Sequence, residues 1–261
     1  MPTPSESLVA MRDAAPLVQC ITNFVAMNFA ANALLAAGAA PAMVHDPEES
    51  GEFAAVARAV TVNIGTLSPR WLAGMSEAVA VAQKAGTPWV LDPVACFATT
   101  LRREGTGKLL QMQPTIVRGN ASEIMAIAGE DSSGQGVDAG DPVAAAEAGA
   151  RKVAEASGSV VAVTGEVDYV TDGTRAVRIA GGSALMPRVT ATGCSLTTVC
   201  GAYAAVVEPF DATVAALVHF AAAGELAADK AEGPGSFIPA FLDALAAVGP
   251  DTLNEDRVSV A

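Results

Sequence analysis

The stretch PLVQCITNFVAMNFAANALLAAGAAPAMV, residues 16–44, contains a complete strand–helix–strand pattern. The apolar run PLVQCI (16–21) predicts a buried strand that stops at a polar pair. Residues 25–37 are rich in alanine and predict a helix, which Gly38 ends as the residue after its last turn. PAMV (41–44) predicts a second short strand. This order of elements predicts a parallel βαβ unit.

The same alternation continues along most of the chain. Short apolar runs predict strands, and the longer alanine-rich segments between them predict helices. Further strands are predicted at residues 59–65, 88–93, 115–119 and 160–165, a hairpin at 168–179, and further helices at 49–58, 68–85, 120–128, 141–157, 192–207, 211–230 and 235–247. Strands separated by helices predict an α/β fold with a mostly parallel central sheet covered on both faces.

Two segments are expected to be irregular. Residues 129–140 are polar and predict a surface loop, and the polar tail after Pro250 predicts a frayed terminus. The chain contains no Pro/Ser-rich linker, composition break or internal repeat. We therefore expect residues 1–261 to form a single domain.

The composition excludes several classes of protein. Of the 261 residues, 51% are hydrophobic and 16% charged, which is not the composition of a disordered chain. The formal net charge of −13 argues against nucleic acid as a partner, because such binding needs clustered lysine and arginine, but not against a nucleotide. No apolar run is long enough to predict a membrane-spanning helix, and the N-terminus lacks the pattern of a secretory signal. We therefore expect no membrane partner.

The four cysteines are widely spaced and form no CxxC pair. Cys20, Cys96 and Cys200 are expected to be small buried residues of a protein in a reducing cytoplasm. Two lone histidines do not form the Cys/His cluster that a structural zinc site needs. Cys194 belongs to a separate motif.

Ligands of an open parallel sheet bind at the carboxyl ends of its strands. This rule selects a short list of candidate positions: Asn23, Met43, Asp92, residues 118–123, Thr164 with Gly165, and the loop VTATGCS (189–195). Asn23 could instead be only a turn residue, and Met43 only a core residue. Asp92 could orient a metal-bound water or simply form a turn.

The loop VTATGCS is the most informative of these because it leads directly into a predicted helix. The first N–H groups of a helix lack intrahelical partners and lie at the positive end of its dipole, so they form an anion site. Gly193 lets the backbone approach a ligand closely. Cys194 falls in the first turn, where the pKa of a thiol is expected to fall, so it could serve as a base or a nucleophile. The alternative is that these small residues only pack the helix against the sheet.

The segment RGNASEI (118–124) is the second candidate. Asn120 and Glu123 lie three residues apart and share a helix face, and their oxygens suit Mg²⁺. The same spacing is also typical of an N-cap residue followed by an acid at the third helical position, so the pair could simply cap the helix. Arg118 could contact a phosphate or pair with a surface acid.

Together these segments resemble the hydroxyethylthiazole kinases of thiamine salvage, a branch of the ribokinase-like superfamily. The matching segments span nearly the whole chain in family order: residues 16–49, NIGTLSP (63–69), LDPV (91–94), PTIVRGNASEI (114–124), VTGEVDYVTDG (163–173) and VTATGCSLTTVCGAYAA (189–205). The resemblance implies a three-layer α/β/α fold and phosphorylation of the hydroxyl of 4-methyl-5-(2-hydroxyethyl)thiazole by ATP with Mg²⁺. It also implies a homotrimer with active sites between subunits.

The resemblance assigns roles to the residues that match family motifs. Cys194 stands where most superfamily kinases have an aspartate base and the thiazole kinases have cysteine. Asn120 and Glu123 match the Asn-x-x-Glu metal motif, and Asp92 is a further carboxylate near Mg²⁺. The remaining implied assignments are ATP contacts by Arg118 and Thr164, substrate contacts by Asn23, Met43, Ala191 and Gly193, and an anion hole made by the amides of Ala191, Thr192 and Gly193.

Two positions depart from the family pattern. Ala191 replaces the glycine of a GTGC loop, and Ala95-Cys96-Phe97 follows LDPV where the family continues with glycines and small residues. The bulky Phe97 is expected to shape the nearby pocket differently.

Three other functions are compatible with parts of this pattern. One is a ribokinase-like kinase acting on a hydroxymethylpyrimidine, on pyridoxal or on a sugar, although ITNFVAMNF (21–29) favours the thiazole. The second is a nucleotide-dependent dehydratase on the same fold, which needs no alcohol acceptor. The third is an acidic ATP-binding regulator or trimeric scaffold without chemistry.

Overall fold

The alternating strands and helices build one large sheet with helices on both sides. The computed structural model describes residues 2–130, 142–253 and 255–261. Its strands are β1 Leu17–Ile21, β2 Ala40–Ala42, β3 Ala59–Asn63, β4 Trp89–Asp92, β5 Ile116–Asn120, β6 Val160–Thr164, β7 Val167–Thr171, β8 Ala176–Ala180 and β9 Val258–Val260. They pair in the order β2-β1-β3-β4-β5-β6-β7-β8-β9. The pairs from β2 through β6 are parallel, and the last three are antiparallel.

The parallel strands are buried on both faces, which is why their sequences are continuous apolar runs rather than alternating ones. All five residues of β3 and all four of β4 are buried. The register places Asn63 opposite Asp92 and Asn120 opposite Thr164. The last residues of these strands therefore line one edge of the sheet.

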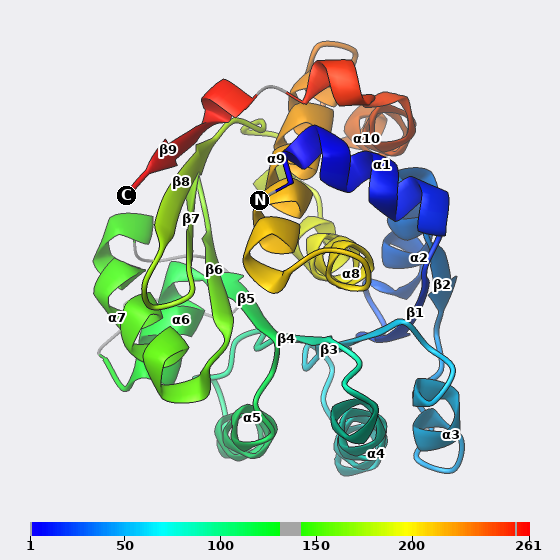
Figure 1. Cartoon of the computed structure of the whole chain (residues 1–261), viewed down its shortest axis with the longest axis vertical. Helices are drawn as coiled ribbons and strands as arrows, with labels where there is room; N and C mark the ends of the chain where they lie inside the picture. Colours follow the sequence, from blue (N-terminus) through cyan, green and yellow to red (C-terminus); the bar gives the residue numbers. More distant parts are fainter. Residues whose placement is uncertain (1, 131–141, 254) are drawn as a thin grey trace.

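The helices form two layers around the sheet. They are α1 Pro4–Ala14, α2 Met27–Ala37, α3 Ser50–Ala54, α4 Pro69–Ala85, α5 Thr100–Gln111, α6 Ala121–Ala128, α7 Val143–Ser157, α8 Thr192–Ala204, α9 Pro209–Ala228 and α10 Pro234–Ala247. Helices α2, α8 and α9 cover one face, with α1 and α10 outside them, and α3 to α7 cover the other (Figure 1). The predicted three-layer α/β/α architecture with a mostly parallel sheet is confirmed.

Small residues bring the helices close to the sheet. At Gly201 in α8, a Cβ atom would lie 2.5 Å from Cγ2 of Thr61 in β3, so only glycine permits this approach. Helix α9 is long and apolar enough to cross a membrane, but 78% of its most apolar window is buried inside the structure. It is a core helix, which accounts for part of the high apolar content of the chain.

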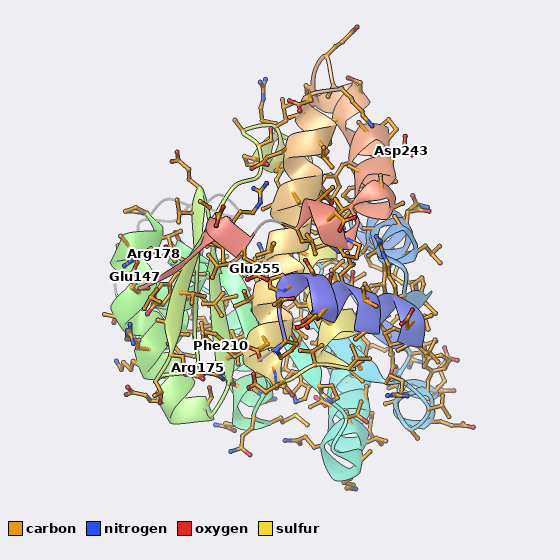
Figure 2. The ribbon with its side chains drawn as sticks, turned by 45° about the horizontal axis from the view of Figure 1, so that its top comes forward. Glu147, Arg175, Arg178, Phe210, Asp243 and Glu255 are labelled. Carbon is orange, nitrogen blue, oxygen red and sulfur yellow. The ribbon has the colours of Figure 1, made fainter. Side chains whose placement is uncertain are left out.

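The antiparallel hairpin of β7 and β8 is held to its neighbours by charged and aromatic side chains (Figure 2). Arg178 of β8 pairs with Glu147 of α7 at 2.8 Å. Arg175 in the hairpin turn lies over the ring of Phe210 in α9, 4.2 Å from its centroid. The predicted hairpin at 168–179 is thus confirmed.

Three parts of the chain differ from the sequence-based expectation. Helix α1 was not predicted, although Thr3 and Glu6 form a capping box at its start. Helix α5 was not predicted because its glycines and weak apolar periodicity hide it. The tail is not frayed: β9 pairs with β8, and Leu253 is buried. The loop predicted at 129–140 falls mostly on residues 131–141, which lie outside the described residues.

Candidate active site

A continuous network of polar side chains joins four elements at the carboxyl edge of the sheet. Asp92 ends β4 and Asn63 ends β3, and the Nδ2 group of Asn63 donates to Asp92 Oδ2 at 2.7 Å. Asn23, which follows β1, donates from Nδ2 to Asn63 Oδ1 at 2.8 Å and to the sulfur of Cys194 at 3.3 Å. Residues far apart in the sequence therefore meet because parallel strands end at one edge.

Asp92 lies at the centre of this network and is fully buried. Its Oδ2 atom also accepts a hydrogen bond from the Thr197 hydroxyl at 2.8 Å, and the Arg118 guanidinium lies 3.6 Å away. Burial raises the pKa of Asp92, and the charge of Arg118 opposes that shift. Within the described part of the chain, Asp92 Oδ1 is buried without a hydrogen-bond partner. A buried oxygen of this kind is costly unless a ligand uses it.

Arg118 connects the network to the loop before α8. Its Nη2 group donates to the Thr164 hydroxyl at 2.5 Å. A Cβ atom at Gly193 would lie 2.8 Å from Nη1 of Arg118, so the guanidinium rests against the bare backbone of the helix start. The cation and the first amides of α8 thus face the same space, as an anion site requires.

The loop before α8 has a strained entry. Ala191 precedes the helix in the left-handed conformation, with φ +70° and ψ −1°. The Ser195 N–H donates to the Ala191 carbonyl at 2.9 Å, so the amides of residues 192–194 precede the hydrogen-bonded part of the helix. The Thr192 hydroxyl is used within the loop, where it donates to the Val189 carbonyl at 2.9 Å. The Thr192 hydroxyl is therefore engaged within the loop, and the backbone amides at the helix start are the groups suited to an anion.

Cys194 has a higher pKa than the sequence suggested. Burial, and then the Asp92 carboxylate, raise its pKa to about 11, although the Asn23 amide, the charge of Arg118 and the Asn63 amide act in the opposite direction. The expectation that a first-turn position lowers this pKa is therefore wrong. Removing a thiolate from water next to a carboxylate outweighs the favourable end of the helix dipole.

Asn120 and Glu123 form a reciprocal capping box at the start of α6. Glu123 N–H donates to Asn120 Oδ1 at 2.9 Å, and Asn120 N–H donates to Glu123 Oε2 at 2.8 Å. The other carboxylate oxygen, Glu123 Oε1, accepts from the Ala95 N–H at 2.9 Å. Burial, together with the Asp92 carboxylate, raises the pKa of Glu123 to about 7. Asn120 and Glu123 thus cap the helix, and these hydrogen bonds hold the Glu123 carboxylate near Asp92.

The positions that depart from the family pattern adopt definite conformations. Ala95 has a φ of +48°, a value that favours glycine, and presents its N–H to Glu123. Cys96 is buried, and Phe97 packs against the apolar cluster around Trp71 and Met75. The Phe97 ring is therefore partly buried against that cluster.

Met43 follows β2 and is half-buried. It packs against the large apolar cluster on the α8 face of the sheet, and its carbonyl faces the His45 ring at 3.3 Å. Its side chain has no described polar link to the Asp92 network. Its assignment to the substrate therefore rests on the family pattern.

Sequence reasoning missed three residues of this site. Asn63 follows the same carboxyl-end rule that selected Asp92 and could have been found by applying it to β3. Thr197 is one helical turn after Cys194 and had no separate signal. Arg102 of α5 donates to the carbonyls of Ile64 and Val94, and also to that of Gly65, so it holds the loops after β3 and β4 together.

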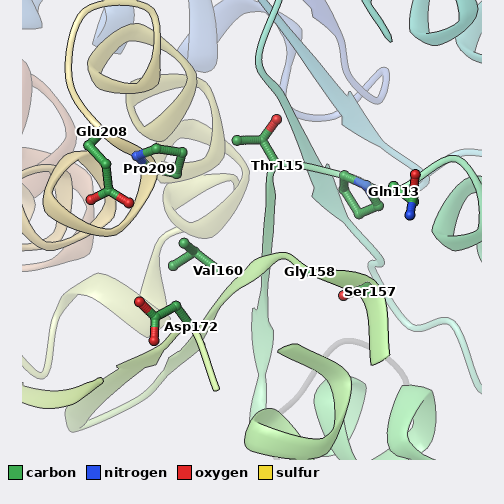
Figure 3. A pocket seen from close by; sticks show the side chains of 9 residues that line it. Gln113, Thr115, Ser157, Gly158, Val160, Asp172, Glu208 and Pro209 are labelled. Atoms are coloured by element: carbon green, nitrogen blue, oxygen red, sulfur yellow. The ribbon is translucent and has the colours of Figure 1, made fainter. Parts of the chain in front are cut away.

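A surface hollow of about 470 Å³ lies at the opposite edge of the sheet (Figure 3). Its lining includes Thr115 and Gly158, which precede β5 and β6, and Glu208 before α9. Asp172 and Glu208 there are engaged by Arg175, at 2.7 and 3.2 Å. The hollow lies at the amino ends of the strands, so it is separate from the network around Asp92.

The chain matches the Hydroxyethylthiazole kinase family over residues 8–251. It is 64% identical over 247 residues to the hydroxyethylthiazole kinase of Cereibacter sphaeroides, covering 95% of this chain and 94% of that protein. It is 63% identical over 262 residues to the hydroxyethylthiazole kinase of Rhizobium johnstonii, covering 99% and 98%.

Solved structures agree with this assignment. The hydroxyethylthiazole kinase protein of Pyrococcus horikoshii has a TM-score of 0.91 and 39% identity, over 99% of this chain and 98% of that chain. The pyridoxal kinase of Staphylococcus aureus has a TM-score of 0.63 and 16% identity, over 82% and 89% of the two chains, which shows a shared ribokinase-like fold alone. The family match and the similarity to the three hydroxyethylthiazole kinases show that the chain belongs to the hydroxyethylthiazole kinase family.

Proposed function

We propose that this chain transfers the γ-phosphoryl group of ATP to the hydroxyl of 4-methyl-5-(2-hydroxyethyl)thiazole in thiamine salvage. The observation that carries the proposal is the meeting of the α8 amides, Arg118 and the Asp92 network at one edge of the sheet. Phosphoryl transfer depends mainly on positioning and charge stabilisation. The site offers donors for phosphate oxygens and, at Cys194, a sulfur beside the place where an alcohol can approach.

The phosphates are assigned to the start of α8. The amides of Ala191, Thr192 and Gly193 form the anion hole for the transferring group, because preorganised N–H groups stabilise charge that develops during transfer. Arg118 and Thr164 contact ATP, and their mutual hydrogen bond supports a common position. These charges are needed because the chain as a whole, at −13, repels ATP.

The carboxylates fit the Mg²⁺ that the family implies. Asp92 has a buried oxygen without a hydrogen-bond partner among the described residues, and Glu123 is held beside it. The described residues contain no group of three or more His, Cys, Asp or Glu side chains placed to hold a metal. Mg²⁺ is typically bound by one or two carboxylates together with phosphate oxygens and water, so this sparse set suits it. Asp92, Asn120 and Glu123 would hold the ion, which would neutralise phosphate charge.

We assign the thiazole to the part of the site next to Asn23 and Cys194, at the end of the network away from Asp92. Asn23 and Met43 contact the ring, with the Ala191 and Gly193 backbone close to the reacting hydroxyl. Cys194 accepts or orients the hydroxyl proton. Because a neutral thiol is a weak base, the anion hole supplies more of the rate than Cys194 does.

We further propose that the chain acts as a single-domain homotrimer in the cytoplasm, with active sites between subunits. The continuous sheet from β2 to β9 supports a single domain. Phe24 and Val25 directly follow Asn23 and are 68% and 62% exposed, which supports contact with another subunit beside the site. Four free cysteines fit a reducing compartment.

ADP production measured with and without the thiazole alcohol tests this function. We expect ADP release that depends on the thiazole and much less on pyridoxal, hydroxymethylpyrimidine or a sugar. ATP binding without thiazole-dependent ADP would instead favour a regulator or scaffold. Preference for one of the other alcohols would reassign the substrate within the ribokinase-like kinases.

A further inference from the structure

Asn63 lies between the carboxylate and the thiol of the site. It is the last residue of β3 and only 3% exposed. Its Oδ1 atom accepts hydrogen bonds from Asn23 Nδ2 at 2.8 Å and from the Gly65 N–H at 2.9 Å, while its Nδ2 group donates to Asp92 Oδ2. Every polar atom of this side chain therefore has a partner.

The orientation of the Asn63 amide is determined by its neighbours. The Gly65 N–H can only donate, so the atom facing it must be the Asn63 oxygen. The Asn63 NH₂ group must then face Asp92, whose Oδ2 atom also accepts from Thr197. If the amide were reversed, its NH₂ group would face two donors, the Gly65 N–H and Asn23 Nδ2, and its oxygen would face the acceptor Asp92 Oδ2. Such contacts are unfavourable in a buried site.

The Asn23 amide is oriented in the same way from its other end. Its Oδ1 atom accepts the backbone N–H groups of Val25 at 3.1 Å and Ala26 at 3.0 Å. Its NH₂ group must then face Asn63 Oδ1 and Cys194 Sγ. The orientations of the Asn63 and Asn23 amides are thus both fixed, and an Nδ2–H group of Asn23 points at the Cys194 sulfur.

We propose that Asn63 is a positioning residue that holds the Asn23 amide so that an Nδ2–H points at the sulfur of Cys194. The sulfur then accepts a hydrogen bond, and the thiol proton is directed away from Asn23. A donated hydrogen bond also favours the thiolate, which burial beside Asp92 disfavours. Asp92, Asn63 and Asn23 form a connected series of hydrogen bonds, and each bond in such a series polarises the next.

Alkylation of Cys194 by iodoacetamide at one fixed pH tests this proposal on the free protein. Asn63→Leu removes the acceptor that holds Asn23 and the contact of Asn63 itself with the thiol, so we expect Cys194 to react about five-fold more slowly, the factor expected for one lost hydrogen bond. Peptide mass mapping separates Cys194 from Cys20, Cys96 and Cys200, which are nearly inaccessible. Thr197→Val is the matched control, because it removes another hydrogen bond to Asp92 Oδ2 without cutting the path through Asn23.

A double-mutant cycle in kcat tests the same link during turnover, and this part rests on the proposed function. Asn63→Leu should lower kcat about ten-fold, the lower end expected for a supporting partner of a site residue. In a Cys194→Ala background the same change should lower kcat less than about two-fold, because the group it positions is absent. Thr197→Val should lower kcat equally in both backgrounds.

Equal losses of kcat for Asn63→Leu in both backgrounds, or Cys194 alkylation at or above the native rate, would overturn the proposal. Thermal unfolding checks that the Asn63→Leu variant is folded. If it is not, Asn63→Ser replaces it, because the serine side chain is too short to bridge Asn23 and Asp92. If the native protein releases no thiazole-dependent ADP, the proposed function fails while the alkylation comparison still decides the role of Asn63.

Discussion

Cys194 shows how a local rule can be outweighed by its surroundings. A cysteine in the first turn of a helix normally has a lowered pKa. Here burial and the Asp92 carboxylate raise that pKa to about 11. At neutral pH the residue is a neutral thiol, so its proposed role as a proton acceptor depends on how bound substrate and phosphate charge change this pKa.

Two substitutions at Cys194 separate proton acceptance from positioning. Cys194→Asp restores the acceptor that most superfamily kinases carry, so we expect it to retain activity. Cys194→Ala should lower kcat by about 10²-fold, the lower end of general-base effects, with ATP binding unchanged. A folded but inactive Asp variant, or an Ala variant with native turnover in the ADP assay, would contradict a proton-acceptor role.

Glu123→Gln tests whether the capping residue also supports the metal. The amide retains one oxygen acceptor, for the Ala95 N–H, but its NH₂ group replaces the Oε2 atom that accepts from the Asn120 N–H, and the charge that attracts Mg²⁺ is lost. We expect a several-fold higher Mg²⁺ concentration for half-maximal ADP production. An unchanged Mg²⁺ titration would leave Asn120 and Glu123 as a helix cap alone.

Ala191→Gly tests the strain at the entry to α8. Alanine at φ +70° is disfavoured, whereas glycine adopts this region freely. We expect the free energy of unfolding to rise by about 0.5–1 kcal/mol in urea titrations, after the greater freedom of glycine in the unfolded chain is deducted. Ala31→Gly in the middle of α2 is the control and should lower the free energy of unfolding by about 1 kcal/mol. If Ala191→Gly also lowered the free energy of unfolding, the left-handed conformation of Ala191 would not be a source of strain that glycine relieves.

At the scale of the helices, one buried histidine ties three of them together. His219 of α9 accepts from the Tyr203 hydroxyl of α8 at 3.0 Å and donates to the Leu245 carbonyl of α10 at 3.0 Å. Burial lowers its pKa to about 4, so it is neutral at pH 7. In this neutral form Nε2–H donates to Leu245 and Nδ1 accepts from Tyr203, so both ring nitrogens have partners.

The acid stability of the protein should reflect this residue. Between pH 6.5 and 4 the unfolded chain binds a proton at His219 that the folded chain does not, so stability falls as the pH falls through that range. The full loss is about 3 kcal/mol, from a pKa near 4 in the fold and 6.5 outside it. His219→Gln does not titrate, and the difference in unfolding free energy between the two proteins should change by that amount. A constant difference would assign the acid sensitivity to other groups.

Helix α5 and strand β9 were harder to predict from the sequence than the alternating strands and helices of the parallel sheet. The strand–helix pattern was readable because apolar runs and glycine stops mark each unit, as at Gly38 and Gly86. Helix α5 was missed because packing beside Leu67 and Leu72, not its own periodicity, stabilises it. Strand β9 was missed because its pairing partner β8 lies some eighty residues earlier, beyond any local pattern.

At the scale of the whole molecule, exposed apolar residues beside the site bear on assembly. We expect a particle of about 79 kDa in light scattering, three times the 26.2 kDa chain. Val25→Glu places a charge on the proposed subunit contact and should shift the particle toward the monomer mass. Val260→Glu, at a 90% exposed position of β9, is the matched control and should leave the mass unchanged. A native monomer, or a Val25 variant of unchanged mass, would exclude this contact.

The sequence by itself determined the layered α/β fold and the family, and it predicted the candidate site at the carboxyl edge of the sheet, because each rests on local runs, caps and motif order. Asp92, Asn120, Glu123 and Cys194 were all selected in this way. The tertiary structure alone decided that Thr197 belongs with them, that Asn63 joins Asn23 to Asp92, that Asn23 donates to the thiol, and that the pKa of Cys194 rises. Those properties depend on burial and on neighbours brought together from distant strands, and no local pattern of residues records either of them.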